Sequence, residues 1–275
     1  MKKALLLSIV VSCGLILGTG YIFSYMNSKV DNNIYGFEKE SMVDTEKFSN
    51  IYVSVNTANI NIIKGDRYSV SYKLSDKEYV RRLEIIKDNL YFETDRNNKF
   101  GHKTSGYNVT IMIPKDKELN ELNLYTIDGN ITNNETIFNK GEFETVFGKI
   151  TLNGSYSNEI EASTTSGGLN IEKGNISKLE FDNKTGKIYI NGIFDDIDIS
   201  SISGSCKFDG KVNNKAEMET ISGKIDVKSG NSSFEAESYG GVYWNGVRKG
   251  YSFSKFENGP HLNLESISGK IKIIE

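Results

Sequence analysis

Glycine recurs every 18 or 19 residues through most of this 275-residue chain, each time with the same pattern of neighbours. Apolar side chains usually stand five and seven residues before it, and others stand two and four residues after it. A fixed period of this length predicts a stacked repeat architecture. The repeated positions are Gly129, Gly148, Gly167, Gly186, Gly204, Gly223, Gly241 and, after a longer gap, Gly269.

Residues 216–227 show what one repeat requires. Ala216 and Met218 alternate with glutamates before the glycine, and Ile225 and Val227 alternate with charged residues after it. Two alternating runs predict two short strands, each with one buried face. The glycine between them fits either a positive φ or a close approach to the neighbouring copy.

The predicted fold class is all-β, a parallel β-helix or β-solenoid whose rungs have 18 or 19 residues and two strands each. An antiparallel hairpin meander is the alternative, because Asn-Gly pairs such as 153–154 also favour tight hairpin turns. The stack is favoured because equivalent positions keep equivalent chemistry from copy to copy. Successive rungs would then lie about 4.8 Å apart.

A parallel stack predicts two apolar core columns, one on each side of the glycine. Cys206 occupies a slot filled mainly by isoleucine, so we expect a buried thiol. The column before the glycine comprises Leu124, Phe143, Ala162, Phe181, Ile199, Met218, Ala236 and Leu264. The column after it comprises Ile131, Ile150, Leu169, Ile188, Cys206, Ile225, Tyr243 and Ile271.

Hydroxyl side chains dominate the position three residues before the glycine, with Asn183 as the exception. Such a polar column can hydrogen-bond from rung to rung, and the pattern allows it to point inward or outward. Its other members are Thr126, Thr145, Thr164, Ser201, Thr220, Ser238 and Ser266.

The N-terminus predicts a membrane segment. Two lysines precede an uncharged, mostly apolar run at residues 4–23, which is long enough for a helix to span a bilayer. We expect residues 1–26 to be a signal anchor, with the C-terminal part extracellular at the cell membrane. A cleaved signal peptide, with Gly18 and Gly20 near the cleavage site, and a lipoprotein signal at Cys13 are the alternatives.

The remaining organisation follows from the pattern. Residues 27–50 are polar and predict a tether, and residues 51–118 predict an irregular β cap region. This region opens with a degenerate repeat that has Ala58 in the glycine slot. Residues 119–275 form the predicted solenoid, with a loop insertion at residues 246–260. A cap is needed because an open end would expose unpaired backbone groups.

Composition excludes several functions. The net charge of −3 and the absence of a basic stripe argue against a nucleic-acid partner. His102 and His261 stand far apart, and no clustered ligand spacing predicts a metal or cofactor. No serine lies in a nucleophile elbow. The sequence therefore predicts a protein that is not an enzyme.

Acidic residues recur six positions before the glycine and predict an acidic face. Others recur two positions later, and lysines such as Lys149 and Lys187 follow the glycine on the other sheet. A solvated face, a surface for a cationic partner, and the acids of a hydrolase are the alternatives. The first acidic column comprises Glu142, Glu161, Glu180, Asp198, Glu217 and Glu235.

The insertion at residues 246–260 is aromatic and basic. Arginine and lysine accompany its aromatic residues, and a tryptophan comes just before it. These side chains either fold over the final rungs as a lid or form a ligand-binding surface. The candidate ligand-binding residues are Trp244, Tyr251, Phe253 and Phe256.

The run Val109–Lys115, followed by Leu119, Leu122, Leu124 and residues 126–131 (TIDGNI), resembles the bacterial putative-adhesin family. The resemblance covers residues 51–275 and implies a β-solenoid at a bacterial envelope, often anchored to the membrane. It supplies no catalytic residues.

Three hypotheses for the function follow. The first is a membrane-tethered, adhesin-like binding or envelope-sensing module for a cell-envelope, protein or glycan ligand. A carbohydrate-active β-helix enzyme acting on envelope polysaccharide is the second, and a structural surface spacer is the third.

Overall fold

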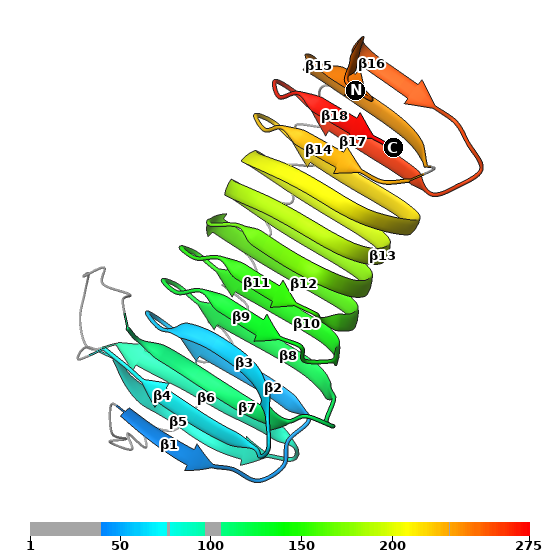
Figure 1. The fold of residues 1–275 in the computed structure, drawn as a ribbon. Helices are drawn as coiled ribbons and strands as arrows, with labels where there is room; N and C mark the ends of the chain where they lie inside the picture. The colour runs from blue at the N-terminus through cyan, green and yellow to red at the C-terminus, as the bar shows by residue number, and fades with distance from the viewer. Residues whose placement is uncertain (1–39, 76–77, 97–105, 231) are drawn as a thin grey trace.

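The computed structural model describes residues 40–75, 78–96, 106–230 and 232–275, whose regular elements are all β-strands (Figure 1). The all-β prediction is therefore confirmed for this part of the chain. The predicted helix at residues 4–23 lies outside the described residues. Within them, no helix has the length and apolar character needed to cross a membrane.

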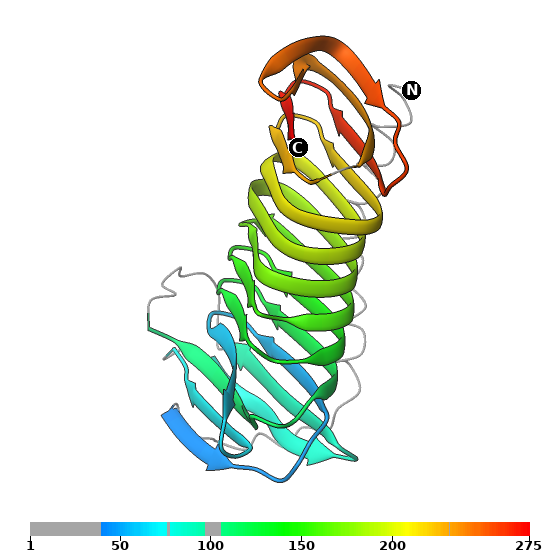
Figure 2. The same ribbon diagram turned by 45° about the vertical axis from the view of Figure 1, so that its right-hand side comes forward.

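The strands stack into a flattened rod with two broad faces (Figures 1 and 2). Face A carries the strand that precedes each glycine, and face B carries the strand that follows it. Face A contains β2 (Asn50–Val55), β6 (Asn89–Arg96), β8 (Leu119–Thr126), β10 (Phe138–Thr145), β12 (Tyr156–Ser166), β17 (His261–Ser266) and the first half of β15 (Ser233–Trp244). Face B contains β3 (Asn59–Gly65), β7 (Asn108–Pro114), β9 (Ile131–Asn134), β11 (Ile150–Asn153), β14 (Ile225–Lys228) and β18 (Ile271–Ile274). The strand β13 (Leu169–Thr220) is continuous for 52 residues and winds through both faces.

Equivalent positions of successive rungs pair in parallel. Phe143 lies between Leu124 and Ala162 on face A. On face B, Ile150 lies between Ile131 and Leu169. The parallel stack is therefore confirmed for these rungs, and the hairpin meander is wrong for them.

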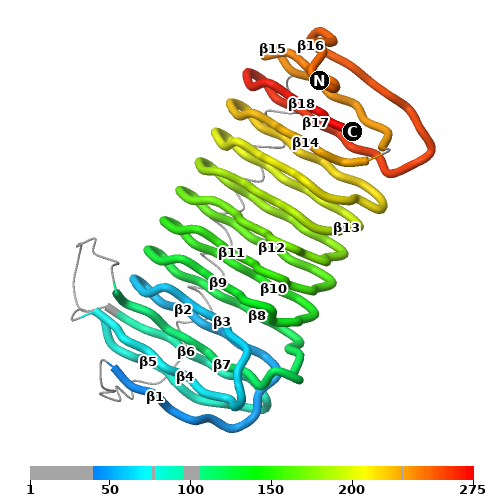
Figure 3. The backbone as a smooth tube through the Cα atoms, in the orientation of Figure 1, coloured from blue at the N-terminus to red at the C-terminus, as the bar shows by residue number. Residues whose placement is uncertain are grey.

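The spatial order of the rungs differs from the chain order at both ends of the rod (Figure 3). The β2–β3 rung lies between β6–β7 and β8–β9. Near the other end, β17 lies between β13 and β15, so the rung at residues 261–274 separates two rungs that precede it in sequence. The repeat pattern cannot predict this order, because each rung presents the same chemistry to any neighbour.

Antiparallel strands close both ends of the stack. At the N-terminal end β5 pairs with β6, β4 pairs with β7, and β1 pairs with β4. At the C-terminal end β16 pairs with β15. The bounds of these capping strands are β1 (Glu40–Asp44), β4 (Ser69–Lys73), β5 (Glu78–Ile86) and β16 (Val247–Lys255).

The buried carboxylate of Glu78 closes one corner of the N-terminal end. It accepts hydrogen bonds from the Asn56 backbone N–H at 2.8 Å and the Thr57 hydroxyl at 2.6 Å. In the interior of the rod, the next rung supplies the hydrogen bonds at this corner. Ala58 lies in the glycine slot beside Gly129, as the sequence predicts.

The core columns and the column of hydroxyls both point inward. Every hydroxyl of that column, and Asn183, is buried. Thr145 donates a hydrogen bond of 2.9 Å to the carbonyl oxygen of Gly129, and Ser266 donates one of 3.0 Å to that of Gly223. Each such bond ties one rung to the corner of its neighbour.

Cys206 is a core residue, as predicted. It pairs with Ile225 of the adjacent rung, and its Sγ lies 3.9 Å from the Sδ of Met218. Burial raises the pKa of its thiol to about 12, so the thiolate does not form near neutral pH.

Close approach, rather than φ, accounts for most of the repeated glycines. A Cβ on Gly167 would lie 1.7 Å from the carbonyl oxygen of Gly148, and a Cβ on Gly148 would lie 1.8 Å from that of Gly129. Neither Gly148 nor Gly167 has a positive φ. Gly186 meets both constraints, because its φ is +146° and its Cβ would also contact the preceding rung.

The predicted glycine slot at Gly241 lies one residue too late. Gly240, not Gly241, lies against the carbonyl of Gly269. The corner of this rung is one residue shorter than the others, because Ser238 pairs with Ser266 while Val242 pairs with Ile271. Val242 therefore takes the core position predicted for Tyr243, and Tyr243 faces outward beside Lys272.

Gly167→Ala should lower the free energy of unfolding by about 1–3 kcal/mol, because a backbone carbonyl occupies the space that the new methyl group needs. Gly230→Ala is the matched control, since a Cβ there would meet no atom within 4 Å. Urea denaturation followed by circular dichroism measures both. Equal midpoints for the two variants would contradict the close-approach explanation.

Thr145→Val should cost about 0.5–1.5 kcal/mol, because it removes a buried hydrogen bond while keeping the side-chain shape. Thr220→Val should be neutral or stabilising, since the buried Thr220 hydroxyl has no hydrogen-bond partner in the described part of the chain. The same urea titration distinguishes the two, and a loss at Thr220 as large as that at Thr145 would refute the assignment.

Candidate functional site

Two of the predicted surfaces can be located on the rod: the acidic column of face A and the aromatic C-terminal end. In the acidic column, Glu161 pairs with Glu142 on one side and Glu180 on the other. Strand spacing places such neighbours about 4.8 Å apart. The predicted row of acids is therefore present in the middle of the rod.

The acidic column is interrupted near its C-terminal end, which corrects the prediction of an unbroken row. Asn263 pairs with both Glu217 and Glu235 and so separates them. The cause is the insertion of β17 between β13 and β15. In the second acidic column the same insertion has the opposite effect, because Glu265 comes between Glu219 and Glu237 and joins them into three consecutive acids.

Lysines along one edge of face A partly neutralise the acids. Lys140 Nζ lies 3.3 Å from a carboxylate oxygen of Glu161, and Lys178 Nζ lies 2.6 Å from one of Glu180. Lys215 Nζ lies 2.7 Å from Glu217. Sequence reasoning missed these lysines, although each stands eight residues before a glycine, or two before an acid of the column.

Two acids of the column, Glu142 and Asp198, lie in surroundings that disfavour their charged form. Burial and then the nearby carboxylate of Glu161 raise the pKa of Glu142. Burial, followed by the carboxylates of Glu217 and Glu180, raises the pKa of Asp198. The lysines therefore leave the column with a negative potential.

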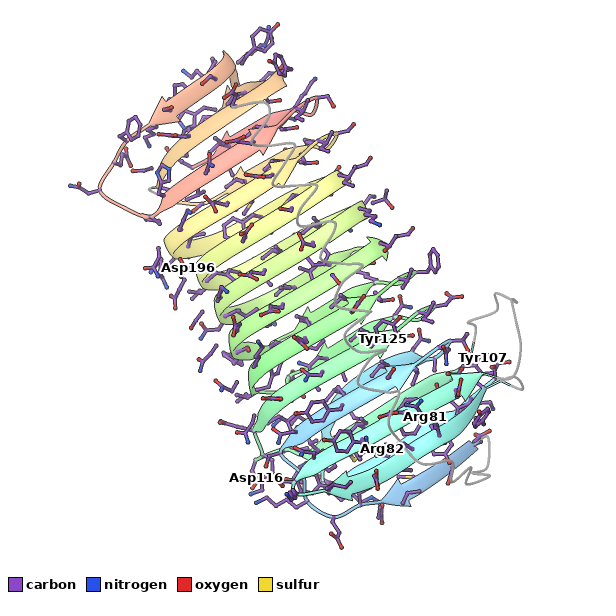
Figure 4. The ribbon with its side chains drawn as sticks, turned by 180° about the vertical axis from the view of Figure 1, so that it is seen from behind. Arg81, Arg82, Tyr107, Asp116, Tyr125 and Asp196 are labelled. Carbon is purple, nitrogen blue, oxygen red and sulfur yellow. The ribbon has the colours of Figure 1, made fainter. Side chains whose placement is uncertain are left out.

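The N-terminal end of face A carries a charged aromatic stack that the sequence did not suggest. The rings of Tyr52 and Tyr91 stack with centroids 5.1 Å apart, and the Arg82 guanidinium lies 3.7 Å above the Tyr91 ring. Tyr52 donates a 2.7 Å hydrogen bond to Glu121, and burial together with this carboxylate raises the pKa of Tyr52. Figure 4 labels Arg81 and Arg82 at this end, with Tyr125 and Asp196 farther along the rod.

The four predicted ligand-binding residues of the C-terminal end fall into two groups. Trp244 and Phe253 pack against the core, with ring centroids 5.7 Å apart. Trp244 aligns with Ile273 and so belongs to the last core layer. Lys249 Nζ lies 4.9 Å from the Trp244 ring. This pair matches the lid alternative.

Tyr251 and Phe256 are the other group, and both are exposed. Their exposed fractions are 59% and 72%, and that of the nearby Val247 is 59%. The Arg248 guanidinium lies 5.3 Å from the Tyr251 ring. The end of the rod therefore presents large apolar side chains beside basic ones, on strand β16 and directly after it.

No group of three or more histidine, cysteine, aspartate or glutamate residues in the described part of the chain is arranged to hold a metal ion. The acids of face A stand in evenly spaced rows and do not converge on a point.

Parallel in-register rungs, a glycine at one corner and inward hydroxyls define a β-solenoid. A family model described as Toastrack DUF4097 matches residues 48–243. The match covers well over half of the chain, which therefore belongs to the Toastrack DUF4097 family.

A solved structure supports the same fold. A protein from Parabacteroides distasonis described as a putative lipid binding protein has a TM-score of 0.50 and 17% identity, over 86% of this chain and 96% of that one. A putative adhesin from Bacteroides fragilis has a TM-score of 0.44 and 13% identity, over 88% of this chain and all of the other. At 17% identity, the similarity to the Parabacteroides distasonis protein supports the fold alone. No curated protein matches the chain.

Asp198→Asn should stabilise the fold at pH 7 and have no such effect near pH 3. The pKa of Asp198 is higher in the folded protein than in the unfolded chain, so ionising this carboxyl destabilises the fold. The loss of stability begins near the unfolded pKa of about 3.9 and grows as the pH rises through the folded pKa. Glu235→Gln is the control, because its column neighbours Asn263 and Ser254 are neutral. Urea midpoints at both pH values test this, and a pH-independent effect of Asp198→Asn would contradict it.

Proposed function

We propose that the protein is a non-enzymatic, membrane-tethered binding module at the outer surface of a bacterial cell, with the end of the rod as its docking surface. The observation that supports this proposal most strongly is the exposure of Tyr251 and Phe256 on the capping strand region. Large aromatic side chains and arginine are enriched where proteins bind partners. A rigid rod that ends in such side chains is suited to reaching a ligand.

The tether is the part of the proposal that rests on sequence. The apolar run at residues 4–23 would hold the chain in the membrane, and the polar residues after it would separate the rod from the bilayer. The described strands begin at Glu40, and the β15–β16 cap lies at the opposite end of the rod from β1 (Figure 1). This arrangement would point the aromatic end away from the membrane.

An enzyme acting on envelope polysaccharide is the second candidate, and one observation favours it. Asp198, with its raised pKa, stands between Glu180 and Glu217 on adjacent rungs. Retaining glycosidases hold two carboxyl groups about 5–5.5 Å apart. The arrangement here repeats along the face without setting one pair apart, so we favour the binding function. Asp198→Asn would abolish a glycan-cleaving activity if one existed.

Tyr251→Ser together with Phe256→Ser should reduce binding of the full chain to isolated cell envelopes by at least roughly tenfold, as expected for the loss of two exposed anchor side chains. Trp244 is the only tryptophan, so its fluorescence reports whether the cap remains folded. Co-sedimentation with envelopes measures binding. Ile86→Ser, at an exposed apolar side chain of the N-terminal cap, is the control.

Unchanged binding by the double variant, with normal Trp244 emission, would show that the aromatic C-terminal end of the rod (the tip) is not the docking surface. It would leave the structural spacer as the better description of the rod.

A further inference from the structure

The two broad faces of the rod differ in charge. On face B the residue after the glycine is lysine in several rungs, and two positions later lysine recurs. In that second column Lys207 pairs with Asp226, Asp226 pairs with Lys272, and Lys272 pairs with Tyr243. The outward basic residues of face B in the C-terminal half are Lys187, Lys207, Lys224, Lys228, Lys270, Lys272 and Arg248.

Most of these basic groups have no carboxylate within salt-bridge distance in the described parts of the chain. Lys224 and Lys228 are the exceptions, because they pair with Asp226 and Asp209. Lys207 Nζ instead lies 5.3 Å from the Tyr189 ring, and Lys270 Nζ lies 5.8 Å from the Tyr243 ring. Face B is therefore positively charged along its C-terminal half.

Face A has the opposite sign at the same height on the rod. Its acids outnumber the lysines along its edge, and Asp198 sits among like charges with its pKa raised. Glu161, Glu180 and Glu217 keep 40%, 44% and 35% of their side chains exposed despite their lysine partners. The rod thus has a negative and a positive face, with the same rung spacing on both.

We propose that face A of one copy docks on face B of a second copy, so that rods standing on the same membrane associate side by side. Both faces come from the same rungs, so a sideways shift of one rod brings acids of face A opposite lysines of face B along the C-terminal half. Rods tethered at the same end stand parallel, which is the orientation that such a shift requires. The tether is part of the proposed function, and the docking surface is separate from the tip.

The geometry also fixes the form of the assembly. Face A and face B are different surfaces, so each contact is heterologous. A row of such contacts leaves an unoccupied face A at one end and an unoccupied face B at the other. The product is an open row of rods rather than a closed dimer. Individual surface ion pairs contribute little, so the contact depends on many weak pairs and on the high local concentration that a membrane provides.

The experiment uses the full chain with an N-terminal hexahistidine tag, bound to vesicles of phosphatidylcholine and a nickel-chelating lipid. The tag supplies the attachment, so the result does not depend on how residues 4–23 behave. Donor and acceptor fluorophores at the C-terminus report contact between copies. We expect energy transfer at 0.02 M salt that falls to the level of randomly placed labels at 1 M salt, where the screening length is about 3 Å.

Charge reversal tests which faces meet. The variant with Glu161→Lys, Glu180→Lys and Glu217→Lys should lose energy transfer, and so should the variant with Lys187→Glu, Lys207→Glu and Lys272→Glu. An equal mixture of the two should regain it, because the reversed face of each then meets an opposite charge on the other. If circular dichroism shows that the acid-reversed variant does not fold, glutamine at the same three positions replaces lysine. The glutamine variant should stay folded and show weaker energy transfer.

Two controls separate this proposal from others. Reversal of three exposed lysines of the N-terminal cap (Lys73→Glu, Lys87→Glu and Lys115→Glu) should leave energy transfer unchanged. Tyr251→Ser with Phe256→Ser should also leave it unchanged, even where it abolishes envelope binding. Absence of transfer in the unmodified protein, or no recovery on mixing, overturns the proposal. Loss of heparin binding by the lysine-reversed variant, without transfer in any sample, would assign face B to a polyanion instead.

Discussion

The contact between the glycines of successive rungs is the constraint on which the structure depends. Each repeated glycine from Gly129 to Gly223, together with Gly240 and Gly269, lies so close to a backbone carbonyl of the adjacent rung that a Cβ would overlap it. The hydroxyl three residues earlier donates to that same carbonyl in several rungs, such as Thr145 to Gly129. Close approach and hydrogen bonding therefore hold the same corner of every rung at the same spacing, and the apolar columns align as a consequence.

This regularity leaves the outside of the rod free to vary. Side chains that alternate with the core residues face solvent, so charge on faces A and B can change without disturbing the core. The chain uses this freedom unevenly. Face A carries acids and a few paired lysines, and face B carries lysines of which most are not paired with a carboxylate. Exposed aromatic side chains gather where the repeat ends, at the β16 cap.

The sequence predicted the features that recur with the 18- or 19-residue period. Parallel pairing, the buried slot of Cys206 and the place of Ala58 all follow from equivalent positions having equivalent chemistry. It did not decide the direction of the hydroxyls, because an apolar residue often follows each of them. The sequence did not predict the glycine slot at Gly240, because the corner of that rung is one residue shorter than the others. Gly241 stands three residues after Ser238, which is the usual spacing between the hydroxyl and the glycine, and so it matched the repeat pattern.

The positions of the terminal rungs could not be predicted for a different reason. A rung pairs equally well with any other rung, so the pattern contains no information on which one lies beside it. The insertion of residues 261–274 before the cap broke the predicted acidic row at Asn263. It also placed Trp244 in the last core layer, where the sequence had allowed either a lid or a ligand surface.

The most direct test of the stack is a measurement of scalar coupling across backbone hydrogen bonds by NMR. The account predicts coupling from the amide nitrogen of Phe147 to the carbonyl carbon of Ile127, and from that of Ser222 to that of Ile202. Both pairs join equivalent corners of successive rungs. Coupling of these amides to residues a few positions away, as in hairpins, would contradict the parallel stack and the facing charges built on it.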